Sequence, residues 1–368
     1  MTDSDPDGWL RLAATPGVGA ILAHRLLDRF GLPAHIFAAP VAELAQCVGP
    51  ALAAHLLTAP DAGQQDLIAR ARAWAAQPGH HLLTLIDPRY PAQLLEIADP
   101  PLVLYAVGRI DLLAAPQWAL VGSRRATPHG LRHARQFALA LAQAGLTITS
   151  GLAHGIDGAA HAGALEGAGS TVAVIGTGCD LCYPPAHRDL ARRIAEDGLI
   201  VSELPPGTPP AAGNFPRRNR IIAGLARGVL VVEAAARSGS LITARLAAEQ
   251  GREVGALPGS PTAMLARGCH QLIKDGAALV EEPADILALL GWPAARHGAP
   301  QPGAVATTPA LDGTAARLFT LIGPDPVGFD QLVVHSGLAP EGLAGHLLEL
   351  ELGERITRLP GARYQRLL

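Results

Sequence analysis

The chain has 368 residues, 49% of them hydrophobic, and a formal net charge of −3 at pH 7. This length and apolar content predict two or three domains with large buried cores. No apolar run reaches the ~18 residues that cross a bilayer, and the first residues, MTDSDPDGW, are acidic where a signal peptide is basic. Four cysteines in a chain of this length exclude a disulfide framework, so we expect a cytoplasmic protein without a membrane span.

Residues 9–31 predict two helices joined by the turn PGVG at 16–19, whose glycines supply the backbone freedom of a tight turn. This pattern is similar to a helix-hairpin-helix, in which the N–H groups of the turn either touch a nucleic-acid phosphate or have a structural role only. Helical periodicity continues to about Gln77, where Pro78-Gly79 breaks it. We therefore expect an N-terminal all-helical, SAM-like domain over residues 1–80.

From Leu82 the pattern changes to short apolar runs, rich in β-branched residues, that alternate with helical stretches. The runs are TLI, LVLYAVG, WALVGS, LTITSG, TVAVIGTG, LIVSE, GVLVVEA and EVGALPG. Alternation of this kind predicts an α/β fold, with a mostly parallel sheet covered by helices on both faces. We expect one doubly wound domain over residues 81–291, with its ligands at the carboxyl ends of the strands.

Residues 292–310 are rich in Pro, Gly and Ala and predict a linker. Residues 311–368 then show three helical patterns and a closing pair of strands around the turn LPGA, which indicates a winged helix. The expected recognition helix, residues 340–352, carries Glu341, Glu349 and Glu351 but no Lys or Arg. Phosphates would be repelled by this surface, so we expect a structural or protein-contacting role for it rather than base reading.

A basic helix, a buried strand, a Ser-Gly-Ser loop and a second helix follow one another over residues 215–248. The window 204–232 contains no Asp or Glu, and its arginines are Arg217, Arg218, Arg220 and Arg227. Such a positive region in a chain of negative net charge indicates an anionic partner. Phe215, the only aromatic residue in the basic segment, either stacks on a base or belongs to the core.

Three loops, one of them the Ser-Gly-Ser loop just described, connect a strand to a helix and carry polar residues. They are GSRRATP at 122–128, with Pro128 suited to the first helical position, SGLAHGID at 150–157, with Asp157 expected to cap the helix, and RSGS at 237–240. Helix N-termini and arginines bind anions, so this row of sites predicts an oligonucleotide strand rather than a single nucleotide. The residues expected to bind the strand are Gly122, Ser123, Arg124, Arg125, Thr127, Ser150, Gly151, His154, Phe215, Arg217, Arg218, Asn219, Arg220, Ser238, Gly239 and Ser240.

Other motifs provide weak support for other chemistries. The segment GTG at 176–178 begins a dinucleotide fingerprint, but Leu181 stands where the third glycine belongs, so NAD is not indicated. Cys179 and Cys182 have the spacing of half a zinc site or of a redox pair, but no second pair accompanies them. No compact set of acid, base and nucleophile is present in the sequence, so we expect neither enzymatic activity nor a cofactor or metal.

The sequence from about Tyr90 to Leu279 resembles the DNA processing protein A family, also called DprA or Smf. The resemblance rests on the segments VGSRRATPHG, TSGLAHGIDGAAH, FPRRNRIIAGL and VVEAAARSGSLITARLAAEQGREVGALPGS. It implies an extended Rossmann-like fold and single-stranded DNA binding by a homodimer. It also implies loading of RecA recombinase onto incoming DNA during natural transformation, without enzymatic activity.

By this resemblance Ser123 and Arg124 match the family's strand-binding loop. The family's basic signature FPxRNR is matched by Arg217, Arg218, Asn219 and Arg220. His154 stands where the family usually has Arg or Lys, which removes a permanent charge because an unperturbed histidine is mostly neutral at pH 7. The resemblance also implies a dimer surface around Leu272, Ile273 and Leu279.

The alternative function is that of a nucleotide phosphoribohydrolase of the lysine-decarboxylase-like group, which has a related fold. In that group a glycine-rich loop, PGGxGTxxE, supplies the glutamate of the site. Here the corresponding segment is EAAARSGS, which begins with Glu233 and lacks the glycine run. The sequence therefore favours the DNA-binding function.

Overall fold

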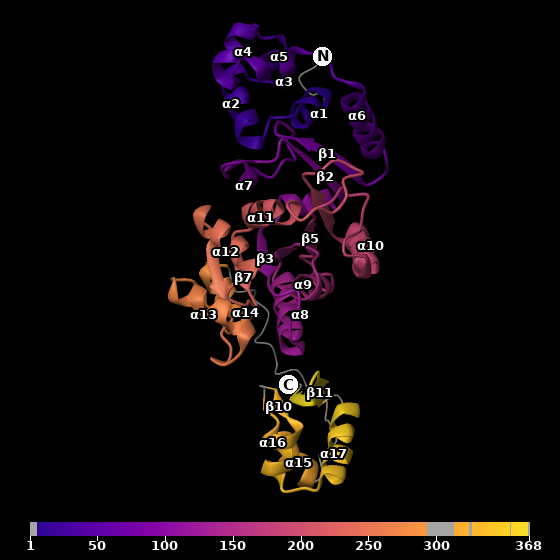
Figure 1. Ribbon diagram of the computed structural model, residues 1–368, viewed down its shortest axis with the longest axis vertical. Helices are drawn as coiled ribbons and strands as arrows, with labels where there is room; N and C mark the ends of the chain where they lie inside the picture. Colours follow the sequence, from indigo (N-terminus) through magenta and orange to yellow (C-terminus); the bar gives the residue numbers. More distant parts are fainter. Residues whose placement is uncertain (1–5, 293–312, 324–325, 354, 367–368) are drawn as a thin grey trace. The chain divides into compact units, whose positions relative to one another are not determined.

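The computed structural model describes residues 6–292, 313–323, 326–353 and 355–366 (Figure 1). They form two compact units, a larger one that ends at Trp292 and a smaller C-terminal one. Within these ranges, no helix has the length and apolar character needed to cross a membrane.

Six helices form the N-terminal part of the larger unit. They are α1 (Pro6–Ala14), α2 (Ala20–Phe30), α3 (Pro33–Ala38), α4 (Val41–Val48), α5 (Pro50–Leu57) and α6 (Ala62–Ala75). The turn at 16–19 separates α1 from α2, and Gly17 adopts a φ of 84° there, which favours glycine. Buried Trp9 and Trp74 belong to the same core as Val103 and Tyr105 of the sheet, so the helices rest on one end of that sheet.

The centre of the larger unit is a nine-stranded sheet. Its strands are β1 (His80–Thr84), β2 (Val103–Gly108), β3 (Gln117–Val121), β4 (Thr147–Ser150), β5 (Thr171–Val174), β6 (Leu199–Ser202), β7 (Gly228–Val231), β8 (Glu253–Ala256) and β9 (Ala278–Leu279). They lie in the order β1-β2-β6-β5-β4-β3-β7-β8-β9. Strands β3 to β9 run parallel, whereas β1 pairs antiparallel with β2 and β2 antiparallel with β6.

Helices cover both faces of this sheet (Figure 1). The pleat sends Ala119 and Val121 into one core and Trp118 and Leu120 into the other, as alternation along a buried strand requires. The first face is covered by α7 (Ala92–Leu95), α11 (Asn214–Leu225), α12 (Ser240–Glu249) and α13 (Arg267–Lys274). The second is covered by α8 (Pro128–Gln143), α9 (Ile156–Ala164), α10 (Arg188–Asp197) and α14 (Pro283–Leu289).

The strand order reverses at β3. Strands β4, β5 and β6 follow on one side of it, and β7, β8 and β9 lie on the other. The loops that leave β3 and β7 therefore diverge to opposite faces, and a doubly wound sheet opens a crevice at such a point, beyond the carboxyl ends of its strands. The topology alone thus marks the end of β3 and β7 as the place for a ligand.

The C-terminal unit is a winged helix. Its elements are α15 (Gly313–Leu321), β10 (Val327–Gly328), α16 (Phe329–Ser336), α17 (Pro340–Leu352), β11 (Ile356–Leu359) and β12 (Arg363–Arg366), and the sheet order is β10-β12-β11. Leu318, Leu332, Leu347 and Tyr364 form its separate core. The helix α17 has the bounds expected of the recognition helix.

The predicted fold class, an α/β sheet with a helical N-terminal part and a winged helix, is confirmed. Two short strands, β9 and β10, were not predicted, because two residues are too few to form an apolar run. The run TLI at 84–86 is not a strand throughout: β1 ends at Thr84, whose carbonyl oxygen accepts a hydrogen bond from the Asp87 N–H in a turn.

Candidate functional site

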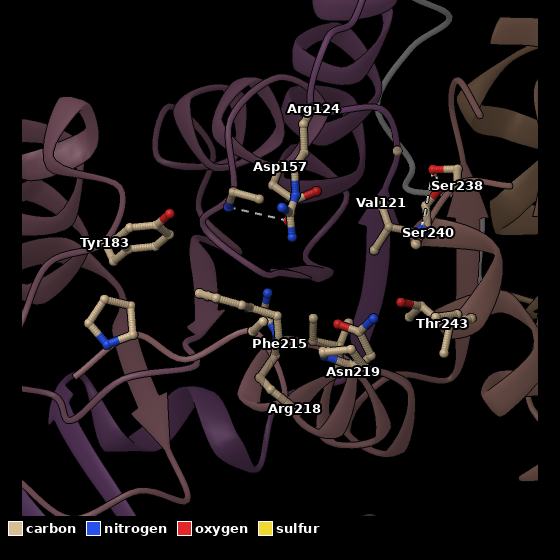
Figure 2. Close-up of a pocket in the computed structure, with 18 of the residues that line it drawn as sticks. Val121, Arg124, Asp157, Tyr183, Phe215, Arg218, Asn219, Ser238, Ser240 and Thr243 are labelled. Carbon is tan, nitrogen blue, oxygen red and sulfur yellow. Dashed lines mark hydrogen bonds between the residues drawn. The ribbon is translucent and has the colours of Figure 1, made fainter. Parts of the chain in front are cut away.

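A pocket of about 620 Å³ opens at the carboxyl ends of β3 and β7 (Figure 2). Its walls come from the loops after β3, β4, β5, β6 and β7 and from α11. The predicted binding residues that line it are Gly122, Arg124, Phe215, Arg218, Asn219, Ser238, Gly239 and Ser240. The fold therefore brings half of the sixteen predicted positions to one cavity.

One face of α11 forms the floor of this pocket. Phe215, Asn219 and Ile222 are spaced by four and three residues, so they lie on the same side of the helix. The carboxamide of Asn219 makes no hydrogen bond to any other residue that the structure describes, and Figure 2 shows it in the cavity opposite Arg124. It is thus available to a ligand as both donor and acceptor.

An aromatic pair lies at one end of the pocket. The rings of Tyr183 and Phe215 have centroids 5.5 Å apart and an interplanar angle of 35°. The guanidinium carbon of Arg124 is 5.7 Å from the centroid of the Phe215 ring, within the range of a cation–π contact. Because Tyr183 is 45% exposed, this arrangement offers a planar ligand a face to stack on.

The sequence pattern did not identify Tyr183. It lies in the loop after β5, and nothing in the segment CYPP distinguishes it from an ordinary surface tyrosine. Its position after a parallel strand is the one signal that could have identified it, since every loop at this edge of the sheet faces the ligand site.

Arg218 lies under the pocket rather than in the open. Its side chain is buried, and its Nη1 donates to the carbonyl oxygens of Gly151, at 2.6 Å, and Val174. A Cβ on residue 151 would lie 2.5 Å from the same nitrogen, so a side chain there would displace the guanidinium. Burial lowers the pKa of Arg218 to about 10, which leaves it charged at neutral pH beneath the β4–α9 loop.

A carboxylate also lines the pocket. Asp157 was expected to cap α9, but Gly155 is the N-cap residue and Asp157 is the second residue of the helix. Its Oδ2 instead accepts hydrogen bonds from the N–H groups of Gly151, at 3.1 Å, and Ala153, at 3.4 Å. Burial raises the pKa of Asp157 to about 6, although Arg218 and those N–H groups favour the ionised form.

Two predicted serines support loops instead of facing the cavity. Ser150 is fully buried, and its Oγ donates to the Leu120 carbonyl oxygen at 2.6 Å. The Ser123 Oγ accepts from the Arg125 N–H at 3.1 Å, and the Ser123 N–H donates to the Glu233 carbonyl oxygen at 2.7 Å. The Ser150 bond links the end of β4 to β3, and the Ser123 N–H bond links the end of β3 to the loop after β7.

A buried histidine holds the loop after β4 from below. The Nε2 of His161 accepts from the Leu152 N–H at 3.2 Å, and its Nδ1 lies 2.7 Å from the Thr171 Oγ1. Burial lowers the pKa of His161 to about 3, so the ring is neutral and can accept. Leu152 has a φ of 56°, a left-handed conformation that this hydrogen bond helps to stabilise.

Two arginines of the basic signature are paired with acids. Arg220 is buried, with its Nε 2.7 Å from the Asp99 Oδ2 and its Nη2 2.5 Å from the Glu203 Oε1. Arg217 lies 3.1 Å from the same Glu203 oxygen. Residues 204–232 contain no acid, but in the folded protein Asp99 and Glu203 lie next to their arginines. The interpretation of this window as an unbalanced positive region is therefore wrong for Arg217 and Arg220.

The loop after β7 supplies hydroxyl groups to the pocket. The Oγ atoms of Ser238 and Ser240 are 2.7 Å apart, and α12 begins at Ser240. The first N–H groups of this ten-residue helix therefore lie at the pocket wall, where an anion is stabilised by the helix dipole.

The remaining predicted positions lie around the pocket. Arg125 and the exposed His154 line an adjoining hollow, and Thr127 immediately precedes α8, which begins at Pro128 as expected. The residues expected at the dimer surface differ in exposure: Leu272 and Ile273 are partly buried on α13, whereas Leu279 is 49% exposed on β9.

Across the described ranges, no group of three or more His, Cys, Asp or Glu side chains is placed to hold a metal ion, and Cys179 and Cys182 are free thiols.

Comparison with known proteins identifies the family. The family model described as DNA recombination-mediator protein A matches residues 81–291, and the DprA winged helix domain matches residues 301–362. Protein Smf of Synechocystis sp. is 38% identical over 400 residues, which cover 100% of both chains. The solved structure of DNA processing protein A from Streptococcus pneumoniae is 38% identical with a TM-score of 0.65, over 76% of this chain and 95% of that one.

A second solved structure, of DNA processing protein A from Helicobacter pylori, concerns the single-stranded DNA binding mode of that protein. It is 31% identical with a TM-score of 0.53, over 57% of this chain and 95% of the other. The family match covers more than half of the present chain and includes the loops and helix that build the pocket. This chain belongs to the DNA recombination-mediator protein A family, also called DprA or Smf.

Proposed function

We propose that this protein binds single-stranded DNA in the pocket at the ends of β3 and β7. The observation that carries the proposal is the combination, in one cavity, of an aromatic pair with positive charge: Tyr183 and Phe215 beside Arg124 and Arg218. Single-strand binders use this combination, because bases stack on aromatic rings while arginines and helix N-termini hold the phosphates.

The size of the pocket favours an unpaired strand. A volume of about 620 Å³ is in the range of small-molecule sites and suits a nucleotide. In a duplex the bases are stacked inside, so only an unpaired base can reach the faces of Tyr183 and Phe215. The binding mode studied in the Helicobacter pylori relative is consistent with this choice.

Membership of the family supports the further parts of the proposal. We propose that the protein processes incoming DNA during natural transformation, loads RecA recombinase onto the strand, and works as a cytoplasmic homodimer without a cofactor and without chemical catalysis. The dimer would form around α13 and β9, where Leu272, Ile273 and the exposed Leu279 lie at one end of the sheet.

Arg124→Ala tests the DNA-binding proposal most simply. We expect weaker binding to oligo-dT and to single strands of other sequences alike. The salt dependence of the affinity should be flatter by about 0.7 in log–log slope, because one phosphate contact is lost. Arg109→Ala is the matched control. Arg109 is exposed and follows β2, which runs antiparallel to β6. Because Gly108, the last residue of β2, pairs with Leu199, the first residue of β6, Arg109 lies at the amino ends of the parallel strands, away from the pocket.

Fluorescence anisotropy at several salt concentrations measures both quantities, and a nucleotide-hydrolysis assay on the same samples tests the phosphoribohydrolase alternative. Equal affinity and slope for wild type and Arg124→Ala would contradict the assignment of the pocket. Release of base from a nucleoside monophosphate, together with no oligo-dT binding, would instead support the enzyme.

A further inference from the structure

A second hollow, of about 760 Å³, lies between α8, α9 and the segment before α10. We call it the α8–α9 groove. Its charged and titratable lining residues are Arg124, Arg125, Arg132, Arg135, His154 and His187. No Asp or Glu is among the described residues that line it, so the groove carries an excess of positive charge.

The floor of the groove is built from small residues on one side of α9. Gly158 faces His187, and a Cβ at that position would be 2.7 Å from the His187 Cε1. The Nδ1 of His187 donates to the Leu152 carbonyl oxygen at 3.0 Å, and its ring meets that of His154 edge-on at a centroid distance of 5.1 Å. The absence of a side chain at 158 therefore keeps the groove open and lets an imidazole form one wall.

Arg124 links the groove to the pocket. Its guanidinium lies over Phe215 in the pocket, and the same residue also lines the groove. Arg125 follows it in the groove, and Arg132 and Arg135 continue along one side of α8, spaced by three residues. Positive groups thus lead without a break from the stacking site to the surface of α8.

An ordinary solvated surface also carries arginines, but there carboxylates of neighbouring residues neutralise their charge through ion pairs. In the groove, Arg135 pairs with Glu166 at 2.5 Å, with both side chains about half exposed. Exposed pairs of this kind are weak in water, so a phosphate group can replace the carboxylate. The pair therefore does not close the groove to a polyanion.

We propose that the α8–α9 groove binds the sugar–phosphate backbone of the segment that adjoins the nucleotide in the pocket, on the same DNA strand. The inference rests on the proposed function, because it requires a strand in the pocket. The groove contributes phosphate contacts through Arg125, Arg132 and Arg135. The described residues that line it include no Phe, Tyr or Trp, so it holds backbone without regard to base sequence.

The test compares oligo-dT of about 2 nucleotides, which occupies the pocket, with oligo-dT of about 16 nucleotides, which also reaches the groove. Arg135→Ala should weaken binding of the long oligomer about fivefold and flatten its salt dependence by about 0.7 in log–log slope, with no change for the short one. Arg109→Ala is the matched control, since Arg109 is also an exposed arginine in a surface ion pair, with Asp111 at 2.9 Å. Arg135→Glu should enlarge the effect of Arg135→Ala, and unchanged short-oligomer binding shows that each variant is folded.

Equal long-oligomer affinity and slope for wild type, Arg135→Ala and Arg135→Glu would overturn the groove, while the proposed function would stand if Arg124→Ala still weakened both lengths. Equal losses for Arg135→Ala and Arg109→Ala would also overturn it, because net charge alone would then explain the effect. If the wild type bound neither oligomer, both the groove and the proposed function would fall.

Discussion

Among the described residues that line the pocket, Asp157 is the single carboxylate, beside Arg124 and Arg218. It is kept there by its hydrogen bonds to the loop after β4, which carries Gly151 over the guanidinium of Arg218. An ionised Asp157 shapes this loop and at the same time offsets part of the positive charge of Arg124 and Arg218. Its protonation state therefore changes the net charge of the pocket, and on the proposed function it should change the affinity for phosphate.

The raised pKa of Asp157, about 6, makes a pH-dependent affinity the expected result. Bound phosphate disfavours the ionised carboxylate, so the pKa in the complex is higher still and binding takes up a proton. Affinity for oligo-dT should therefore rise as the pH falls from about 8 toward about 6. The steepest change is expected between the pKa of the complex and the lower pKa of the free protein.

Asp157→Asn isolates the contribution of this carboxylate from that of the other titratable groups. The amide keeps an oxygen acceptor for the loop but no charge, so the variant should bind oligo-dT more tightly than wild type at about pH 8 and show a smaller pH dependence. Anisotropy titrations across this range measure the difference. Parallel pH profiles for the two proteins would show that Asp157 has a structural role only.

At the scale of elements, α11 divides its basic residues between two tasks. The side with Phe215 and Asn219 lines the pocket, whereas Arg217 and Arg220 pair with Glu203, and Arg220 also pairs with Asp99. The buried Arg220 thus attaches α11 to the segment before β2 and to the end of β6. A stable helix position is a condition for the pocket, since α11 supplies its floor.

Substitution of the two arginines should affect stability very differently. Arg220→Met leaves Asp99 without its buried partner and should lower the free energy of unfolding by about 3 kcal/mol. Arg217→Ala, which removes an exposed partner of Glu203, should lower it by less than about 1 kcal/mol. Urea denaturation followed by circular dichroism provides the comparison, and equal losses would contradict the division of roles along α11.

The roles of these arginines could not be predicted from the local sequence. Asp99 lies 121 positions before Arg220, and Glu203 lies 17 positions before it, just outside the window that contains no acids. The strands, in contrast, were predictable, because each buried parallel strand forms its own apolar run. Periodicity reports burial within an element, whereas pairing across elements depends on the tertiary fold.

At the scale of the whole molecule, the parallel sheet explains why several distant loops could be assigned to one site. The carboxyl ends of β3, β4, β5 and β7 share an edge, so polar residues after each strand were expected to meet, and the pocket contains residues from every one of these loops. The topology did not show which of these side chains are buried. Ser150, Arg218 and Arg220 belong to the predicted binding residues, yet they are buried and hydrogen-bonded within the protein.

The winged helix has a mixed surface. The helix α17 exposes Glu341 and Glu349, as its sequence implied, but the hairpin of β11 and β12 exposes Arg358 and Arg363. Any contact of this unit with DNA would therefore come from the hairpin rather than from the helix. We therefore propose that the main DNA-binding site is the pocket of the larger unit.

Photo-cross-linking of an oligo-dT that carries 5-iodouracil, followed by mass spectrometry of the cross-linked peptides, identifies the residues that contact the bases. Because iodouracil reacts with aromatic side chains stacked on it, we predict cross-links to Tyr183 or Phe215. Cross-links confined to α17 or to the hairpin at 356–366, with none in the pocket, would contradict it.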